Sequence, residues 1–344
     1  MIDRVATYFE VQYRSGVWKA ILACCLVGWS LAGFPAASTQ VQWQMATEYP
    51  ETSVSGIGLV TFGRLVAEHT NGSVTTVNAF DNALQINSGE MLNAAQLGRI
   101  AGGDAFAGPL EAADPIFGLP SLPFVAQSVE AASAINSRAR GLYERALKAK
   151  GLKLLYVTMW PATGLWSDRP VDTADDLRAL AVRTYDDNSA AVLQEAGASA
   201  ESLPFSEALS RLRDHRLNAI LSSGDGGAGR QLWNYLKYFT AINYAIPISI
   251  TFVRMESFQA LPREVQNQVE AAAEETEHLQ LASLSDRTIE NYKRMRANGV
   301  VIAEPASAGV LAALKIAARK PIESWKARAG SEAAGIAEQA IKQQ

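Results

Sequence analysis

From residue 41 onward, short apolar stretches typical of strands alternate with longer stretches that have the spacing of helices. The first such unit places strands at 41–46 and 74–80 on either side of a helix at 56–69, with Asn71 and Gly72 as a turn. A strand, a helix and a second strand in this order form a βαβ unit. The pattern therefore predicts an α/β fold.

The same alternation continues through most of the chain. It predicts further strands at 104–108, 153–159, 180–185, 217–221 and 246–254, and further helices at 90–101, 128–150, 188–196, 205–213 and 230–238. A proline-rich loop, PIFGLPSLPF, precedes the helix at 128–150. Repeated alternation of strands and helices favours parallel sheets.

Residues 262–298 predict one long helix, with Pro262 at its start and Gly299 just beyond its end. A helix of this length would extend about 55 Å, whereas a small domain is about 30 Å wide. The helix must therefore either span two lobes or break, and Ser283 to Ser285 is the candidate break. We expect the spanning form.

The first 38 residues are typical of an export signal. Basic residues precede an apolar run at 20–34, and Ala36, Ala37 and Ser38 supply the small residues of a cleavage site. The run is shorter than the roughly 20 apolar residues of a membrane anchor. We therefore expect export to the periplasm, with cleavage near Ser38.

Composition narrows the classes of function. Both cysteines, Cys24 and Cys25, lie in the signal, so the exported chain would have no thiol for a disulfide or a metal site. Without the signal the formal net charge is −5. This charge argues against nucleic-acid binding, which requires a basic face. The remaining 306 residues exceed what one compact core usually holds, so two lobes are expected.

Two arginines, Arg169 and Arg183, lie beside a predicted strand in an otherwise apolar stretch. A guanidinium presents a planar fork of donors that matches the two oxygens of a carboxylate. Arg183 follows the apolar residues at 179–182 and should therefore lie toward the carboxyl end of the strand, where ligand crevices of α/β sheets open. The pattern indicates capture of an organic anion. Salt bridges to nearby aspartates are the structural alternative for both arginines.

Several segments together resemble the DctP-like substrate-binding proteins of tripartite ATP-independent periplasmic (TRAP) transporters. The markers are FGLPSLPF at 117–124, RPVDTADDLRALAVR at 169–183, Gly197-Ala198, LPFSEALSRLR at 203–213 and the long helix near 262–298. The resemblance covers nearly all of the chain after the signal. Two departures are the lack of a glycine ahead of Arg183 and Asn218-Ala219 where the family usually has Asp-Gly.

This resemblance implies an α/β, two-lobed periplasmic-binding-protein-like fold with a long helix spanning both lobes. We expect lobe I at 39–165, with 248–287 returning to it, and lobe II at 166–247, with 288–344 packing on it. The implied function is capture of a small organic acid and its delivery to the small and large TRAP membrane subunits. The resemblance implies no enzyme activity and no cofactor, and we expect a monomer.

The resemblance also assigns site residues. Arg183 matches the arginine that clamps the ligand carboxylate, and Arg169 matches a supporting arginine of part of the family. Phe205 matches an aromatic residue of the cleft, and Ser222 stands where relatives carry a side-chain donor, often asparagine. Glu48 and Tyr49 follow the first predicted strand, and Trp160 and Trp166 bracket the proposed crossing between the lobes. The two tryptophans could either wall a ligand or pack the hinge.

Two other functions compete with transport. Gly224 to Gly229 satisfy the G-x-G-x-x-G pattern of an NAD(P)-dependent oxidoreductase, but no acidic residue stands about 20 residues further on, where a ribose would need one. We expect a glycine-rich cleft loop there instead. The second competitor, a ligand-sensing module for a receptor, would use the same pocket. Neighbouring genes for two membrane subunits would favour the transporter.

Chemistry by metals or nucleophiles is not indicated. The three histidines, at 69, 215 and 278, are isolated, and no G-x-S-x-G motif is present.

Overall fold

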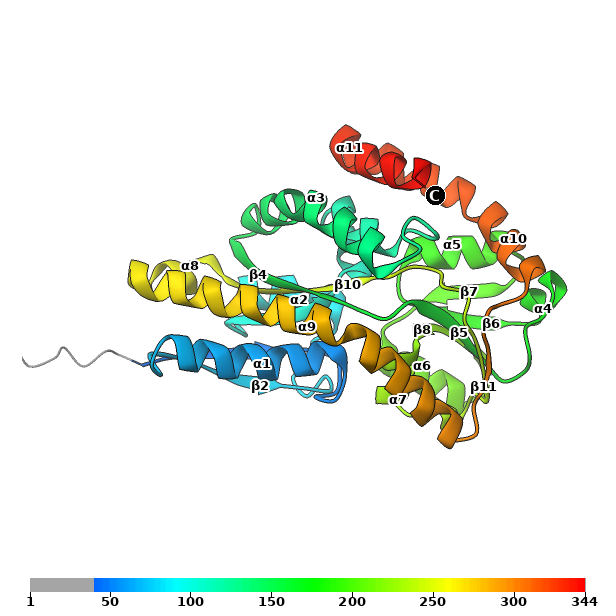
Figure 1. Ribbon diagram of the computed structural model, residues 1–344, viewed down its shortest axis with the longest axis horizontal. Coiled ribbons are helices and arrows are strands. Elements are labelled where there is room, and N and C mark those ends of the chain that lie inside the picture. Colours follow the sequence, from blue (N-terminus) through cyan, green and yellow to red (C-terminus); the bar gives the residue numbers. More distant parts are fainter. Residues whose placement is uncertain (1–39, 344) are drawn as a thin grey trace, which may run out of the picture. The chain divides into compact units, whose positions relative to one another are not determined.

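The structure, a computed structural model, describes residues 40–343, and its strands form two sheets (Figure 1). The predicted signal, with Cys24 and Cys25, lies outside the described residues. The two-lobed α/β architecture is confirmed. We use "first lobe" for the five-stranded sheet with the helices packed on it, and "second lobe" for the six-stranded sheet with its helices.

The sheet of the first lobe has the strand order β2-β1-β3-β10-β4. Its strands are β1 (Val41–Ala46), β2 (Val74–Ala79), β3 (Gly102–Phe106), β4 (Leu152–Met159) and β10 (Ile248–Arg254). The first three are parallel to one another, whereas β10 runs antiparallel to both β3 and β4. The first six residues of β10 are buried, as expected for a strand covered on both faces.

The sheet of the second lobe has the order β11-β9-β5-β8-β6-β7. Its strands are β5 (Thr163–Ser167), β6 (Ala181–Thr184), β7 (Ser199–Ser202), β8 (Ala219–Ser223), β9 (Tyr238–Thr240) and β11 (Val301–Ala303). Strand β5 is antiparallel to β8 and β9. The expectation of parallel sheets was therefore wrong for β5 and β10, the two strands that enter one lobe directly from the other, because each runs antiparallel to its neighbours.

The helices cover both faces of the sheets. They are α1 (Val54–His69), α2 (Ser88–Gln96), α3 (Val129–Lys148), α4 (Ala174–Arg178), α5 (Asp187–Glu195), α6 (Phe205–Arg213), α7 (Gly224–Gly229), α8 (Met255–Gln259), α9 (Arg263–Ala297), α10 (Ala308–Ala317) and α11 (Arg319–Lys342), with 3-10 turns η1 (Gly108–Ala112), η2 (Pro115–Ser121) and η3 (Leu232–Asn234). Across residues 40–343 no helix combines the length and apolar character needed to cross a bilayer.

Three segments connect the two sheets, and α11 also bridges the lobes, because it packs on both α3 and α5. Residues 160–162 lead from β4 to β5, residues 241–247 lead from β9 back to β10, and α9 leads from the first lobe to β11. Figure 1 shows α9, in yellow to orange, alongside α1 and continuing to α7, and it packs on both. The predicted spanning helix is confirmed and does not break at Ser283 to Ser285.

The ends of α9 have ordinary sequence causes. Pro262 occupies its N-cap and Gly299, with φ of 79°, follows its end, where a left-handed residue stops a helix. A buried polar stripe that includes Gln280 and Asn291 runs along its middle.

At the C-terminus, α10 packs on α4 and α5, and α11 packs on α3 and η2 as well as on α5. The predicted lobe boundaries stay a prediction.

The glycine-rich segment forms the short helix α7 rather than the expected loop, and the helix expected at 230–238 is replaced by η3 and β9. The glycines permit close packing. A Cβ on Gly227 would overlap the Trp166 ring, and one on Gly226 would lie 2.6 Å from Ser222 Oγ. Contact with β8 and β5 therefore accounts for Gly226 and Gly227, and it requires no phosphate.

The packing role of Gly227 can be tested against Gly229, where an added Cβ would meet nothing within 4 Å. Gly227→Ala should lower the free energy of unfolding by about 1–3 kcal/mol, because the helix must move off Trp166. Gly229→Ala should leave it unchanged or raise it by up to about 1 kcal/mol. Urea unfolding measures both, and equal losses in the two variants would contradict this account.

Candidate functional site

A small cavity lies between the two lobes at the carboxyl ends of their parallel strands. The first lobe and the crossings contribute Tyr49, Phe106, Trp160 and Pro247, and the second lobe contributes Thr163, Arg183, Tyr185, Phe205, Ser222, Ser223 and Gly226. Ligand crevices of α/β sheets open at this edge. The cavity therefore lies where a ligand would be enclosed by both lobes.

Arg183 is the cation of this cavity. It lies on β6 and is only 4% exposed. Its Nε donates a hydrogen bond of 2.8 Å to the carbonyl of Leu203, and its guanidinium carbon lies 4.9 Å from the centre of the Phe205 ring. Burial lowers the pKa of this guanidinium from its ordinary value, although Tyr49 and Glu48 oppose the effect.

The structural alternative for Arg183, an ion pair with Asp186 or Asp187, is not formed. Asp186 instead caps α5, where its Oδ1 accepts hydrogen bonds from Ser189 N at 2.7 Å and Ser189 Oγ at 2.6 Å. Within residues 40–343 no carboxylate forms an ion pair with Arg183. A buried cation without a counter-ion is costly unless an anion joins it.

Aromatic rings form most of the other walls. The Tyr49 and Trp160 rings are 4.7 Å apart, Phe106 lies 5.9 Å from Trp160, and Tyr185 lies 5.0 Å from Phe106. These contacts join rings of the two lobes, because Tyr185 directly follows β6. The rings give the cavity flat, apolar surfaces beside a single positive charge.

The cavity is narrow. It contains about 300 Å³ of space not filled by protein atoms, of which about 20 Å³ admits water. That is enough for about one water molecule. Any organic acid is larger, so its binding requires the walls of the two lobes to part.

The structure brings Arg183, Phe205, Ser222, Tyr49 and Trp160 together at this cavity, as the sequence indicated. Arg169 is not there. Its side chain is 50% exposed, and its Nε pairs with Asp168 at 2.8 Å. The alternative of a local ion pair describes Arg169, and we leave it out of the site.

Glu48 and Trp166 also point elsewhere. The Glu48 carboxylate accepts hydrogen bonds from the backbone and hydroxyl of Ser88 at the start of α2. The Trp166 ring packs 5.3 Å from Phe239, and its Nε1 donates to the carbonyl of Ser223 at 3.2 Å. Both residues are buried in support of the site and do not line the cavity.

Sequence reasoning missed several lining residues. Phe106 and Ser223 end their strands and Tyr185 directly follows one, so the strand-end rule that selected Arg183 could have found all three. Gly226 belongs to the segment that was expected at the cleft, although it lines the cavity as part of a helix, whereas Thr163 and Pro247 carried no comparable signal.

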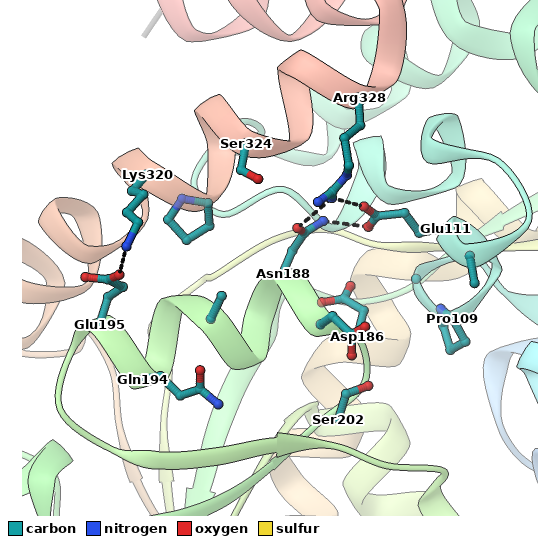
Figure 2. Close-up of a pocket in the computed structure, with 15 residues that line it drawn as sticks. Pro109, Glu111, Asp186, Asn188, Gln194, Glu195, Ser202, Lys320, Ser324 and Arg328 are labelled. Atoms are coloured by element: carbon teal, nitrogen blue, oxygen red, sulfur yellow. Dashed lines mark hydrogen bonds and ion pairs between the residues drawn. The ribbon is translucent and has the colours of Figure 1, made fainter.

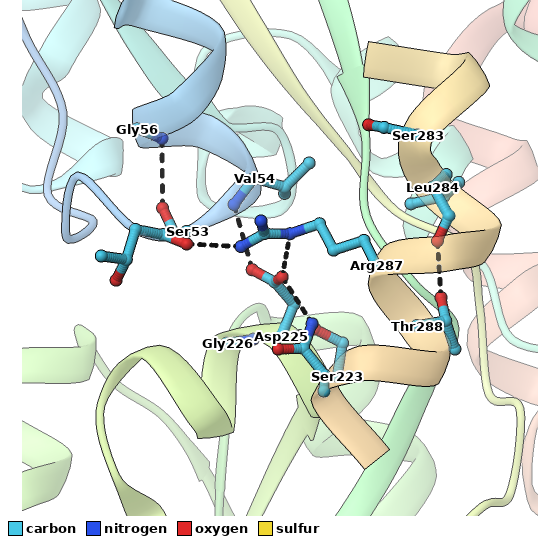
Figure 3. A network of polar contacts seen from close by, with 12 residues as sticks. Ser53, Val54, Gly56, Ser223, Asp225, Gly226, Ser283, Leu284, Arg287 and Thr288 are labelled. Atoms are coloured by element: carbon cyan, nitrogen blue, oxygen red, sulfur yellow. Dashed lines mark hydrogen bonds and ion pairs between the residues drawn. The ribbon is translucent and has the colours of Figure 1, made fainter. Parts of the chain in front are cut away.

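Beside the cavity, a buried carboxylate joins the lobes (Figure 3). Asp225 of α7 accepts a hydrogen bond of 3.0 Å from Val54 N, at the start of α1. Its Oδ2 accepts one of 2.8 Å from Asn291 Nδ2 and forms an ion pair with Arg287. Arg287 and Asn291 are four residues apart and share one face of α9. This network ties α7, α1 and α9 together.

A larger cleft of about 980 Å³ lies between η1, α5 and α11 (Figure 2). Its carboxylates include Glu111, which accepts hydrogen bonds from Asn188 and Arg328. Its other cation, Lys320, pairs with Glu195 at 2.7 Å. Burial and the neighbouring Asp186 raise the pKa of Glu111 to about 7, and burial raises that of Asp186 to about 6. Because both cations are already paired, this cleft suits an anion less than the smaller cavity.

Two lobes that enclose a cavity with one buried, unpaired cation define a solute-binding protein of the α/β type. The chain belongs to the DctP family, bacterial extracellular solute-binding protein family 7, whose model matches residues 45–324. No curated protein sequence matches the chain.

Solved structures share the fold. An extracytoplasmic solute receptor of Bordetella pertussis that binds pyroglutamic acid has a TM-score of 0.83 at 24% identity, covering 88% of this chain and 99% of that chain. A marine metagenome TRAP solute-binding protein specific for pyroglutamate gives 0.82 at 24%, with coverage of 88% and 99%. A TRAP protein of Shewanella oneidensis with bound succinate gives 0.81 at 15%, also with 88% and 99%.

The oxidoreductase alternative loses its basis. Gly224 to Gly229 are turns of α7 itself, whereas a dinucleotide site needs a glycine loop that leads into a longer helix. The family is one of binding proteins, so the expectation of a non-enzyme agrees with membership.

The Asp225 network predicts a large effect on stability. Asp225→Ala should lower the free energy of unfolding by about 3–5 kcal/mol, because it removes the buried acceptor of Val54 and Asn291 and leaves Arg287, which is 18% exposed, without its counter-ion. Asp286→Asn, at an exposed position of α9 next to Arg287, should change the free energy of unfolding by no more than about 0.5 kcal/mol. Chemical denaturation measures both. A loss below about 1 kcal/mol for Asp225→Ala would show that the network contributes little.

The raised carboxyl pKa values predict a pH dependence. Glu111 and Asp186, which face Arg328, Asn188 and Asp187, bind protons more tightly in the folded chain than in the unfolded chain. The free energy of unfolding should therefore rise as pH falls from about 8 to about 5, by on the order of 1 kcal/mol or more. Asp104, whose pKa burial raises to about 6, adds to the same trend.

Glu111→Gln should flatten this rise, and Arg328→Met should steepen it, because Arg328 lowers the pKa of Glu111. Urea unfolding at several pH values measures the slopes. Unchanged slopes in both variants would contradict the assignment to this cleft.

Proposed function

We propose that this protein is the periplasmic solute-binding protein of a TRAP transporter and captures a small organic acid through Arg183. The observation that carries the proposal is the buried guanidinium of Arg183, without a carboxylate partner among residues 40–343, in the wall of an interlobe cavity. Incoming carboxylate oxygens would supply the counter-charge in a setting where charged hydrogen bonds are strong. TRAP receptors among the structural neighbours support the transport role.

The ligand we propose is a compact monocarboxylate with a flat, neutral body. Arg183 is the one cation among the residues that line the cavity, so a second carboxylate would be buried there without a partner. The aromatic walls suit a ring or another planar group. The hydroxyls of Tyr49, Thr163, Tyr185, Ser222 and Ser223 also line the cavity and supply neutral hydrogen-bonding partners for the body of the acid. Of the acids bound by the neighbours, pyroglutamate fits this description best.

Binding is coupled to closure of the lobes. Because the walls come from both lobes and the closed cavity is narrow, the acid meets the site with the lobes apart. The contacts it then makes with walls of both lobes favour the closed arrangement over the open one. The closed form would dock on the two membrane subunits. Export through the segment at 1–38, cleaved near Ser38, places the protein in the periplasm with them.

A thermal-shift panel tests the function. Pyroglutamate should raise Tm more than succinate or D-glucuronate does. At 100 times its Kd it should stabilise the folded protein by about 2.7 kcal/mol. The neutral analogue 2-pyrrolidinone, which lacks the carboxylate, should give no shift.

Arg183→Ala should weaken binding of the best acid at least about 100-fold, because the charged hydrogen bonds are lost. Arg169→Ala is the matched control and should bind as the wild type does. Calorimetry measures both affinities. A wild type that binds none of the acids, or an Arg183→Ala variant of unchanged affinity, would overturn the proposal.

A further inference from the structure

A second arginine, Arg230, links the lobes beside the cavity without lining it. It directly follows α7 of the second lobe, and its side chain is 8% exposed. Its Nη1 lies 3.1 Å from Asp81 Oδ1, and its Nη2 donates a hydrogen bond to the carbonyl of Glu48. Both acceptors belong to loops that follow strands of the first lobe, β2 and β1. The guanidinium therefore joins the two lobes directly.

The same guanidinium contacts two walls of the cavity, one from each lobe. Its central carbon lies 4.7 Å from the centre of the Phe205 ring and 5.8 Å from that of the Tyr49 ring. Arg183 lies 4.9 Å from the same Phe205 ring. Phe205 thus contacts two guanidinium groups, and cations hold their places over aromatic faces through the ring quadrupole. Arg230 orients the rings that a ligand would touch.

Arg230 is poorly placed to anchor a ligand itself. Both of its Nη atoms already have protein acceptors, its charge faces Asp81, and its buried Nε alone is left without an acceptor. Its positive charge also lowers the pKa of Arg183, so the two cations disfavour each other until an anion arrives. Arg230 acts on the site through Phe205, Tyr49 and the loops of the first lobe.

The geometry of the bonds makes them depend on closure. A guanidinium is a rigid planar fork, and both acceptors of this fork lie on the first lobe while its chain lies on the second. Separation of the lobes must break both bonds together. A bound acid can leave only when the walls part, so these bonds oppose its release.

We propose that Arg230 is a positioning residue that fastens the closed lobes and sets the residence time of the ligand. This inference rests on the proposed function, because it concerns the release of the same acid. It predicts that loss of the fork raises koff and changes kon little, since approach occurs with the lobes apart. A residue needed only for folding would not separate the two rates in this way.

Stopped-flow tryptophan fluorescence, to which Trp160 in the cavity wall contributes, can measure both rates with pyroglutamate as the ligand. Arg230→Met should raise koff by about tenfold or more, because it removes both the hydrogen bond to the Glu48 carbonyl and the ion pair with Asp81. Asp81→Asn should raise it by about two- to fivefold, because the Asp81 side chain is 66% exposed. The double variant should release pyroglutamate no faster than Arg230→Met alone, because the two residues act through one contact.

Two further variants separate the fork from its charge. Arg230→Lys keeps the charge but not the planar fork, so its koff should stay raised by several-fold. Arg216→Met is the matched control, because Arg216 pairs with Asp214 at 3.1 Å within the second lobe, and its rates should equal those of the wild type. If Arg230→Met does not fold, Arg230→Lys and Asp81→Asn carry the test.

The possible failures are distinguishable. If binding requires Arg183 but koff is unchanged in the Arg230 and Asp81 variants, this inference is overturned and the proposed function stands. A full rescue by Arg230→Lys would also overturn it, since charge rather than geometry would then matter. A wild type that binds none of the acids would overturn the proposed function and this inference with it.

Discussion

A guanidinium buried among aromatic rings without a carboxylate partner is the constraint on which the site depends. Water has been removed from Arg183, and Phe205 and the Leu203 carbonyl replace it only in part. In such surroundings a charge without a counter-ion weakens the fold. The unpaired charge lies at the junction of the lobes, where an incoming anion would pair with it. In the function we propose, affinity and closure then have the same electrostatic origin.

The short helix α7 connects this charge to the rest of the molecule. Its first turn lines the cavity through Gly226, its Asp225 holds the start of α1 and the middle of α9, and Arg230 follows its end. Glycines let it approach β5 and β8 closely, so it cannot shift without disturbing its neighbours. A change at the cavity wall is therefore felt at contacts with both lobes.

Sequence reasoning located the strand ends but not the direction of each side chain. Glu48 and Tyr49 are adjacent, yet Glu48 turns to the start of α2 and Tyr49 to the cavity. Tertiary contacts decide between such neighbours, and no local pattern records them. The position of Arg183 at the cavity was predictable because the carboxyl ends of strands line ligand crevices and an arginine there can bind an anion. The G-x-G-x-x-G pattern misled because it has two meanings: close packing and phosphate binding both require glycine. The antiparallel β5 and β10 follow from lobe crossings that alternation does not reveal.

The unbroken length of α9 has a mechanical consequence. Its 35 residues form a rod of about 52 Å that contacts α1 at one part and β11 at another. A tilt of about 10° at one end of such a rod displaces the other by about 9 Å, given its rise per residue. A rearrangement of one or two ångströms around a small acid can thus be amplified, lever-like, into a displacement at the outer surface large enough for a membrane protein to sense.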